Sequence, residues 1–236
     1  MSYLSNITRA ALLASVASFG IGSTAQASYS CSLGSCIGFL DTGAIATELN
    51  TNLLFPLFDT NLGTLTSVSV SVHGQLLISG SSTVTNNAGT AQTFNATENS
   101  TFYLADTTSP GGSLGTLLAG VTLTPTYTQH YTSLGAGLSA AFGPSSPIVS
   151  TTLSSPLSAF QALGGGTDTL NVSTLTGTAF AGGGGNVSST FITSGELTID
   201  ILYNYSETPA PEPASLALMG AGLAGLALAR RRRRVG

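Results

Sequence analysis

The chain has 236 residues, of which only 7% are charged and none is lysine, whereas about 25% is usual for a soluble domain. Arg9 and residues 230–234 are its six basic residues, and all ten acidic residues lie between them, so the middle carries 0 − 10 = −10. Because phosphate contacts need Lys or Arg, this composition excludes nucleic-acid binding through a basic surface and a surface held by salt bridges.

The N-terminus has the three regions of a secretory signal peptide in their usual order. Arg9 closes a short positive region, residues 10–21 are apolar, and Ala25 and Ala27 place small side chains before a cleavage site at Ser28. A buried N-terminal helix is the alternative, but it would not require this order. We therefore expect residues 1–27 to form a signal-peptide helix that directs export through the Sec machinery and is removed by signal peptidase.

Two cysteines follow the expected cleavage site. Cys31 and Cys36 are separated by four residues, and an exported chain meets an oxidising compartment, so we expect a disulfide between them. A zinc site would need further ligands, and His73 and His130 lie far away in the sequence. A redox site would favour the C-x-x-C spacing, which is absent.

The middle of the chain alternates between apolar and polar residues with a period of two. Val68, Val70 and Val72 share one face of a strand at residues 66–72, and residues 197–205 and 121–128 show the same pattern. Pro125 should place its strand at an edge or a bulge. Turns are expected at residues 73–74, 86–89, 109–112, 164–166 and 182–185, and short helical turns at 44–54 and 157–163.

Many short strands with Gly and Asn turns predict a mainly β fold. We expect a single antiparallel β-sandwich, jelly-roll or Ig-like, over residues 28–207, because roughly 180 residues can bury one core. This extracellular domain would lie between the N-terminal signal-peptide helix and a C-terminal transmembrane helix.

The C-terminus contains a second apolar segment, residues 214–229, which has no charge. As a helix it would be about 24 Å long, slightly short of the ~30 Å hydrocarbon core, a gap that arginine side chains can close by snorkelling. The positive-inside rule keeps the following arginines in the cytoplasm and the domain outside. The expected membrane stop and orientation signal consists of Arg230, Arg231, Arg232, Arg233 and Arg234.

Pro211, Glu212 and Pro213 stand directly before this segment. The stretch PEPASLALMGAGLAGLALARRRRR resembles the PEP-CTERM sorting tail of Gram-negative bacteria, which combines a Pro-Glu-Pro signature, one transmembrane helix and an arginine cluster. The resemblance implies a tail over residues 208–236, processing at the signature by the membrane transpeptidase exosortase, a transient inner-membrane anchor, and a mature form at the cell surface or outside. Because proline favours an extended chain, residues 206–213 suit an enzyme groove, although a plain spacer is the alternative.

The central region also resembles a known group. Residues 58–68 (FDTNLGTLTSV) and the closing stretch 197–205 (LTIDILYNY) are similar to the choice-of-anchor E extracellular domains. That resemblance covers about residues 30–207. It implies an extracellular domain of a surface-anchored protein, but it implies no particular activity.

Residues that could carry catalysis are few. Neither His73 nor His130 has an obvious Ser and acid partner in the sequence, and the motif G-x-S-x-G is absent. We expect no enzyme. A secreted hydrolase would need a cleft that converges on His130, Asp106 or Asp168 with a poised serine.

Two stretches are weakly similar to calcium sites. Residues 164–170 partly resemble one calcium-binding nonapeptide, although that motif works as stacked copies, and residues 59–61 begin like a calcium loop without its later glutamate. We expect neither a metal nor a cofactor.

The sequence therefore predicts an exported, exosortase-processed structural or interaction protein of the cell surface or the exopolysaccharide matrix. A carbohydrate- or exopolysaccharide-binding module is the alternative, although tryptophan is absent. Ice binding is a remoter one, because the threonines at every second position of 122–128 form one strand, and an ice-binding face needs several adjacent strands in register.

Overall fold

The protein is described by a computed structural model that covers residues 26–108, 112–207 and 219–223. Within these residues strands dominate, and the helix α1 (Ser113–Leu118) has only six residues. The expected mainly β fold of antiparallel sheets is confirmed. One short parallel pair joins β5 (Phe58–Asp59) to β13 (Gln161–Ala162). The single-sandwich topology, jelly-roll or Ig-like, stays a prediction.

The larger of the two main sheets, here called sheet A, has the strand order β1-β2-β16-β6-β12, with β3 paired to β16. The alternation expected at residues 66–72 and 197–205 lies in β6 and β16. Its apolar members are buried, except Tyr205, which is partly buried. The strands are β1 (Gln26–Ser32), β2 (Ser35–Asp41), β3 (Ile45–Ala46), β6 (Gly63–Ile78), β12 (Ile148–Leu153) and β16 (Thr193–Glu207).

The second main sheet, sheet B, has the order β10-β8-β14-β4, with β9 also paired to β8. The strand expected at residues 121–128 is split in two around Pro125, which has no N–H for a ladder, and both pieces lie at the sheet edge as its position requires. The strands are β4 (Asn50–Pro56), β8 (Gln92–Asp106), β9 (Thr122–Leu123), β10 (Thr126–Leu134) and β14 (Thr167–Gly182).

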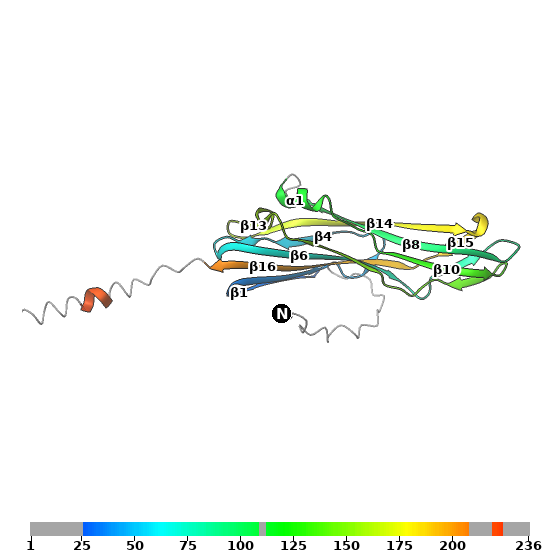
Figure 1. Cartoon of the computed structure of the whole chain (residues 1–236), viewed down its shortest axis with the longest axis horizontal. Coiled ribbons are helices and arrows are strands. Elements are labelled where there is room, and N and C mark those ends of the chain that lie inside the picture. Colours follow the sequence, from blue (N-terminus) through cyan, green and yellow to red (C-terminus); the bar gives the residue numbers. More distant parts are fainter. Residues whose placement is uncertain (1–25, 109–111, 208–218, 224–236) are drawn as a thin grey trace, which may run out of the picture.

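The two main sheets form the layers of an elongated molecule and share its main core (Figure 1). Val70 and Ile199 from sheet A pack in the same buried cluster as Phe102 and Val172 from sheet B. The helix α1 and the 3-10 helix η1 (Leu157–Phe160) add Leu118 and Phe160 to this cluster.

A second, smaller core extends the molecule at the other end. It includes Leu76, Val84, Phe94 and Phe142, and a three-stranded sheet of order β11-β7-β15 lies over it. The strands are β7 (Thr83–Asn86), β11 (Ser139–Ala141) and β15 (Val187–Thr190).

Two local predictions were wrong. The expected turn at His73 and Gly74 lies inside β6, where a Cβ on Gly74 would stand 3.0 Å from the Phe102 ring and 3.1 Å from Leu123. This glycine therefore serves close packing between the sheets. The helical turn expected at residues 44–54 is replaced by β3 and β4, because pairing with β16 and β14 overrides local propensity.

Both chain ends are described only in part. Gln26 and Ala27 pair with Asp41 and Leu40, so β1 runs through the signal cleavage site expected before Ser28. Ala25 and the rest of the signal segment lie outside the described residues. So do Pro211, Glu212, Pro213 and residues 230–234.

The last strand, β16, ends at Glu207. Of the expected transmembrane segment only residues 219–223 are described; they are helical, and Met219 and Leu223 are exposed. Among the described helices, none combines the length and hydropathy that a membrane span requires.

Candidate functional site

Three strands of sheet A bring a serine, a histidine and an aspartate together on its outer face. His73 is in β6, Ser150 in the neighbouring strand β12, and Asp200 in β16 on the other side. Val72 and Ile199 are buried, so alternation turns their neighbours His73 and Asp200 outwards. Because His73 lies directly opposite Ser150 in the register, the two side chains can meet.

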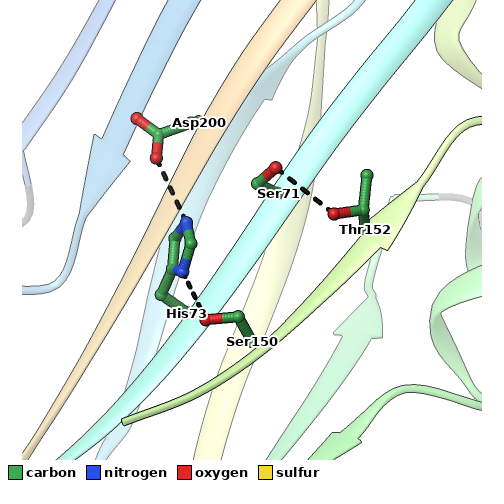
Figure 2. Close-up of polar contacts among 5 residues, drawn as sticks. All are labelled: Ser71, His73, Ser150, Thr152 and Asp200. Carbon is green, nitrogen blue, oxygen red and sulfur yellow. Dashed lines mark hydrogen bonds and ion pairs between the residues drawn. The ribbon is translucent and has the colours of Figure 1, made fainter. Parts of the chain in front are cut away.

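The imidazole of His73 joins the other two side chains (Figure 2). Its Nδ1 lies 2.6 Å from Ser150 Oγ, and its Nε2 lies 3.3 Å from Asp200 Oδ2. Beside this trio, Ser71 Oγ and Thr152 Oγ1 are 3.4 Å apart. The His73 side chain is 34% exposed and that of Asp200 is 60% exposed, so the trio is open to solvent.

With the proton on Nε2, His73 donates to Asp200 and accepts the hydroxyl hydrogen bond of Ser150. A Ser-His-Asp triad uses the opposite ring nitrogens, with Nε2 towards the serine and Nδ1 towards the aspartate. Acyl transfer also needs donors aimed at the developing oxyanion. Strand N–H groups point along the sheet plane, whereas Ser150 Oγ stands above that plane. A shallow hollow of about 310 Å³ reaches Asp200 but not His73 or Ser150. The trio therefore links three strands of sheet A on a surface that is open to solvent.

The sequence missed this trio because its members come together only through strand register. The residues named for a hydrolase do not converge: His130 Nδ1 lies 2.6 Å from Asn95 Oδ1 on sheet B. Asp106 is eleven residues further along β8 than Asn95, which at ~3.4 Å per residue is about 37 Å. Burial, and then the charge of Asp106, raises the pKa of Asp168, so those two carboxylates are neighbours.

The two calcium-like stretches meet through Asp59. Its Oδ1 accepts hydrogen bonds from the backbone N–H of Asn61 at 2.8 Å and of Gly164 at 3.1 Å. This carboxylate therefore holds the glycine loop to β5. Within the described ranges, no group of three His, Cys, Asp or Glu side chains could hold a metal ion.

The disulfide between Cys31 and Cys36 is present, as the sequence predicts. The two residues are directly opposite each other in the β1-β2 hairpin, with Cα atoms 4.0 Å apart. The bond therefore fastens β1, the edge strand of sheet A, to β2.

The threonine row at residues 122–128 has a partner that the sequence did not reveal. Thr124 Oγ1 lies 3.1 Å from Thr101 Oγ1, and Thr128 Oγ1 lies 2.9 Å from Thr97 Oγ1. Register therefore places two threonines of β8 beside this row, with Asn99 between them.

Comparison with protein families decides the nature of the C-terminus. A family model described as the PEP-CTERM protein-sorting motif matches residues 209–234. The chain carries a PEP-CTERM sorting motif. The match includes Pro211, Glu212 and Pro213 and the arginine run, and it begins two residues after β16 ends at Glu207. The motif implies an exosortase-targeted, secreted protein of the cell surface of Gram-negative bacteria.

Other comparisons add little. No curated protein matches the chain. A structure of the infectious bursal disease virus VP2 subviral particle is 14% identical, with 84% of this chain and 49% of that chain covered and a TM-score of 0.24. A structure of the Gx strain of that virus is 13% identical, with 74% and 37% covered and a TM-score of 0.21.

The chain thus spans about half the length of the first viral protein and less of the second. At these TM-scores neither likeness bears on the fold or the function. The similarity of the central region to choice-of-anchor E domains stays a prediction.

Proposed function

We propose that this protein is exported by its N-terminal signal, processed by exosortase at Pro211-Glu212-Pro213, and delivered as a non-catalytic structural or interaction protein of the cell surface or exopolysaccharide matrix. The observation that carries the proposal is the PEP-CTERM motif at residues 209–234. Signal peptidase, the Sec machinery, exosortase and the inner membrane are its processing partners.

The charge distribution supports this route. Residues 28–207 contain no Lys or Arg, so the arginine run after the apolar segment sets the orientation and stays in the cytoplasm. Removal of the tail together with Glu212 leaves the nine acidic residues of 28–207 and none of the arginines of residues 230–234. The mature protein is then a strongly acidic domain that is free to leave the membrane.

The domain suits an extracellular location. Its N-terminal edge strand is held by a disulfide, which persists in oxidising compartments. In the described part of the chain, only the His73–Asp200 contact can become an ion pair, and only when the imidazole is protonated, so stability rests on the apolar cores and on neutral hydrogen bonds. The stability of such a domain changes little when the ionic strength outside the cell changes.

Processing is tested with the full chain in a bacterium that contains exosortase. Replacement of Pro211, Glu212 and Pro213 by Ala should leave unprocessed protein in the inner-membrane fraction, because the recognised signature is gone. Pro209→Ala is the matched control, since it changes the same proline-rich stretch outside the signature. Intact mass of each fraction reports the cleavages and the disulfide together. Normal release of the triple variant would contradict the proposal.

A further inference from the structure

The outward side chains of β4, β8, β10 and β14 form a surface without Asp, Glu, Lys or Arg, which we call the neutral face. Its neutrality comes from strand alternation. In β8 the acidic residues Glu98 and Asp106 stand at inward positions and are 2% and 3% exposed. The odd-numbered residues between them, from Asn99 to Ala105, point outwards.

Hydroxyl groups on this face are held in pairs. Thr97 in β8 bonds to Thr128 in β10 at 2.9 Å, and Thr101 in β8 bonds to Thr124, which lies between β9 and β10, at 3.1 Å. Each pair uses one hydroxyl hydrogen between its members, which leaves a second hydrogen and several lone pairs for an outside partner. The face therefore offers donors and acceptors whose positions are already set.

An amide and an aromatic ring complete the arrangement. Asn171 Nδ2 donates to Asn50 Oδ1 at 2.8 Å and Asn52 Oδ1 at 3.0 Å. In the adjacent row, Tyr103 lies opposite Ser173, which in turn lies opposite Asn50. Tyr103 is 43% exposed, so its ring stands on the face beside fixed polar groups.

These features select the partner by charge and by hydrogen bonding. Residues 28–207 carry nine carboxylates and no Lys or Arg, so a uronate- or phosphate-rich polymer would be repelled. A second copy of the chain would bring the same negative charge. A neutral polysaccharide has hydroxyls for the threonine pairs and the amides, and the apolar side of a sugar ring can lie on a tyrosine ring.

We propose that the neutral face binds an uncharged polysaccharide, with Tyr103 against a sugar ring and Asn171 and the threonine pairs bonded to sugar hydroxyls. This proposal goes beyond the sorting route and does not depend on it. The purified full chain can be tested whether or not exosortase processes it.

The test is affinity electrophoresis of the full chain in non-ionic detergent. Gels contain hydroxyethylcellulose or galactomannan as neutral polymers, or alginate as an acidic one. We expect retardation by a neutral polymer and none by alginate. Tyr103→Ala should lower the association constant about tenfold through loss of the ring, whereas Tyr103→Phe should keep most of it. Phe39→Ala is the matched control, because Phe39 is 38% exposed on the outer face of sheet A.

A second substitution keeps the test valid if Tyr103→Ala unfolds. Asn171→Leu, at similar volume, removes the amide that orients Asn50 and Asn52 and should weaken retardation several-fold, with thermal unfolding as the check on folding. Retardation by neither neutral polymer, or an equal loss in Phe39→Ala, would overturn the proposal. Self-association that Tyr103→Ala abolishes, measured by light scattering without polymer, would assign the face to a second copy instead.

Discussion

The outer faces of the two main sheets are built by the same alternation and yet differ in charge. In β16 the acidic residues Glu196 and Asp200 stand at outward positions, whereas in β8 Glu98 and Asp106 stand at inward ones. Sheet A therefore presents carboxylates on its outer face, whereas the neutral face of sheet B has exposed residues such as His130 and Leu54 but no carboxylate. The position of an acid relative to its buried neighbours therefore decides whether its charge reaches the surface.

The difference also changes how each face is held. On sheet A an ionisable trio links β12, β6 and β16, and a disulfide fastens β1. On the neutral face, uncharged hydroxyls and amides bond to one another across the strands.

The largest loss of stability is expected for Phe102, which lies in the core between the two main sheets. The Phe102 ring fills the space that Gly74 and Gly195 leave open in sheet A, with approaches of 3.0 and 3.3 Å to a Cβ placed there. Phe102→Ala should lower the free energy of unfolding by about 3–5 kcal/mol, measured by urea denaturation. Tyr103→Ala is the outward-facing control. A loss for Phe102→Ala no greater than the control's would show that the two sheets do not share this core.

The next effect should be confined to sheet A. Replacement of Cys31 and Cys36 by Ser should cost about 2 kcal/mol, because the short loop regains freedom in the unfolded chain. Amide hydrogen exchange should accelerate in β1 and remain unchanged in β8. Equal acceleration in both strands would contradict an edge-specific role.

A smaller effect concerns the acid turned inward beneath the neutral face. Burial raises the pKa of Glu98 above its ordinary value of 4.5, and the hydrogen bond from Thr178 opposes this. The folded chain therefore holds the proton of Glu98 more tightly than the unfolded chain. The protonated side chain contributes to the free energy of unfolding below pH 4.5, and this contribution is lost as pH rises towards the folded pKa.

Glu98→Gln should therefore raise the melting temperature at neutral pH and have little effect well below pH 4. Melting curves across this range measure the difference. Glu48→Gln is the control, because Glu48 is an exposed loop residue. A larger gain at low pH than at neutral pH would show that the sign is wrong.

The smallest effect should come from the trio. Ser150→Ala removes one exposed hydrogen bond and should cost no more than about 0.5–1 kcal/mol. Because we propose no catalysis, a fluorophosphonate probe should label neither this variant nor the unchanged protein. If the probe labels Ser150 and His73→Ala abolishes this labelling, the outer face of sheet A contains an active site and the proposal of no catalysis is wrong.

Much of the local structure could be predicted from the sequence. Val68, Val70 and Val72 are buried on one side of β6 as their spacing requires, and the Cys31–Cys36 pairing follows from proximity and export. Gly74 and residues 44–54 could not be predicted, because local turn and helix propensities were overridden by packing across the core and by pairing with distant strands.

By itself, the amino-acid sequence determined the separation of charge between the chain ends and the middle, the buried sides of the main strands, and the sorting motif. Each of these depends on residues that are neighbours along the chain. Only the tertiary structure decided that Ser150 meets His73 and Asp200, and that Thr97 and Thr101 meet a second threonine row. Those meetings depend on strand order and register between segments far apart in sequence, which a local pattern does not contain.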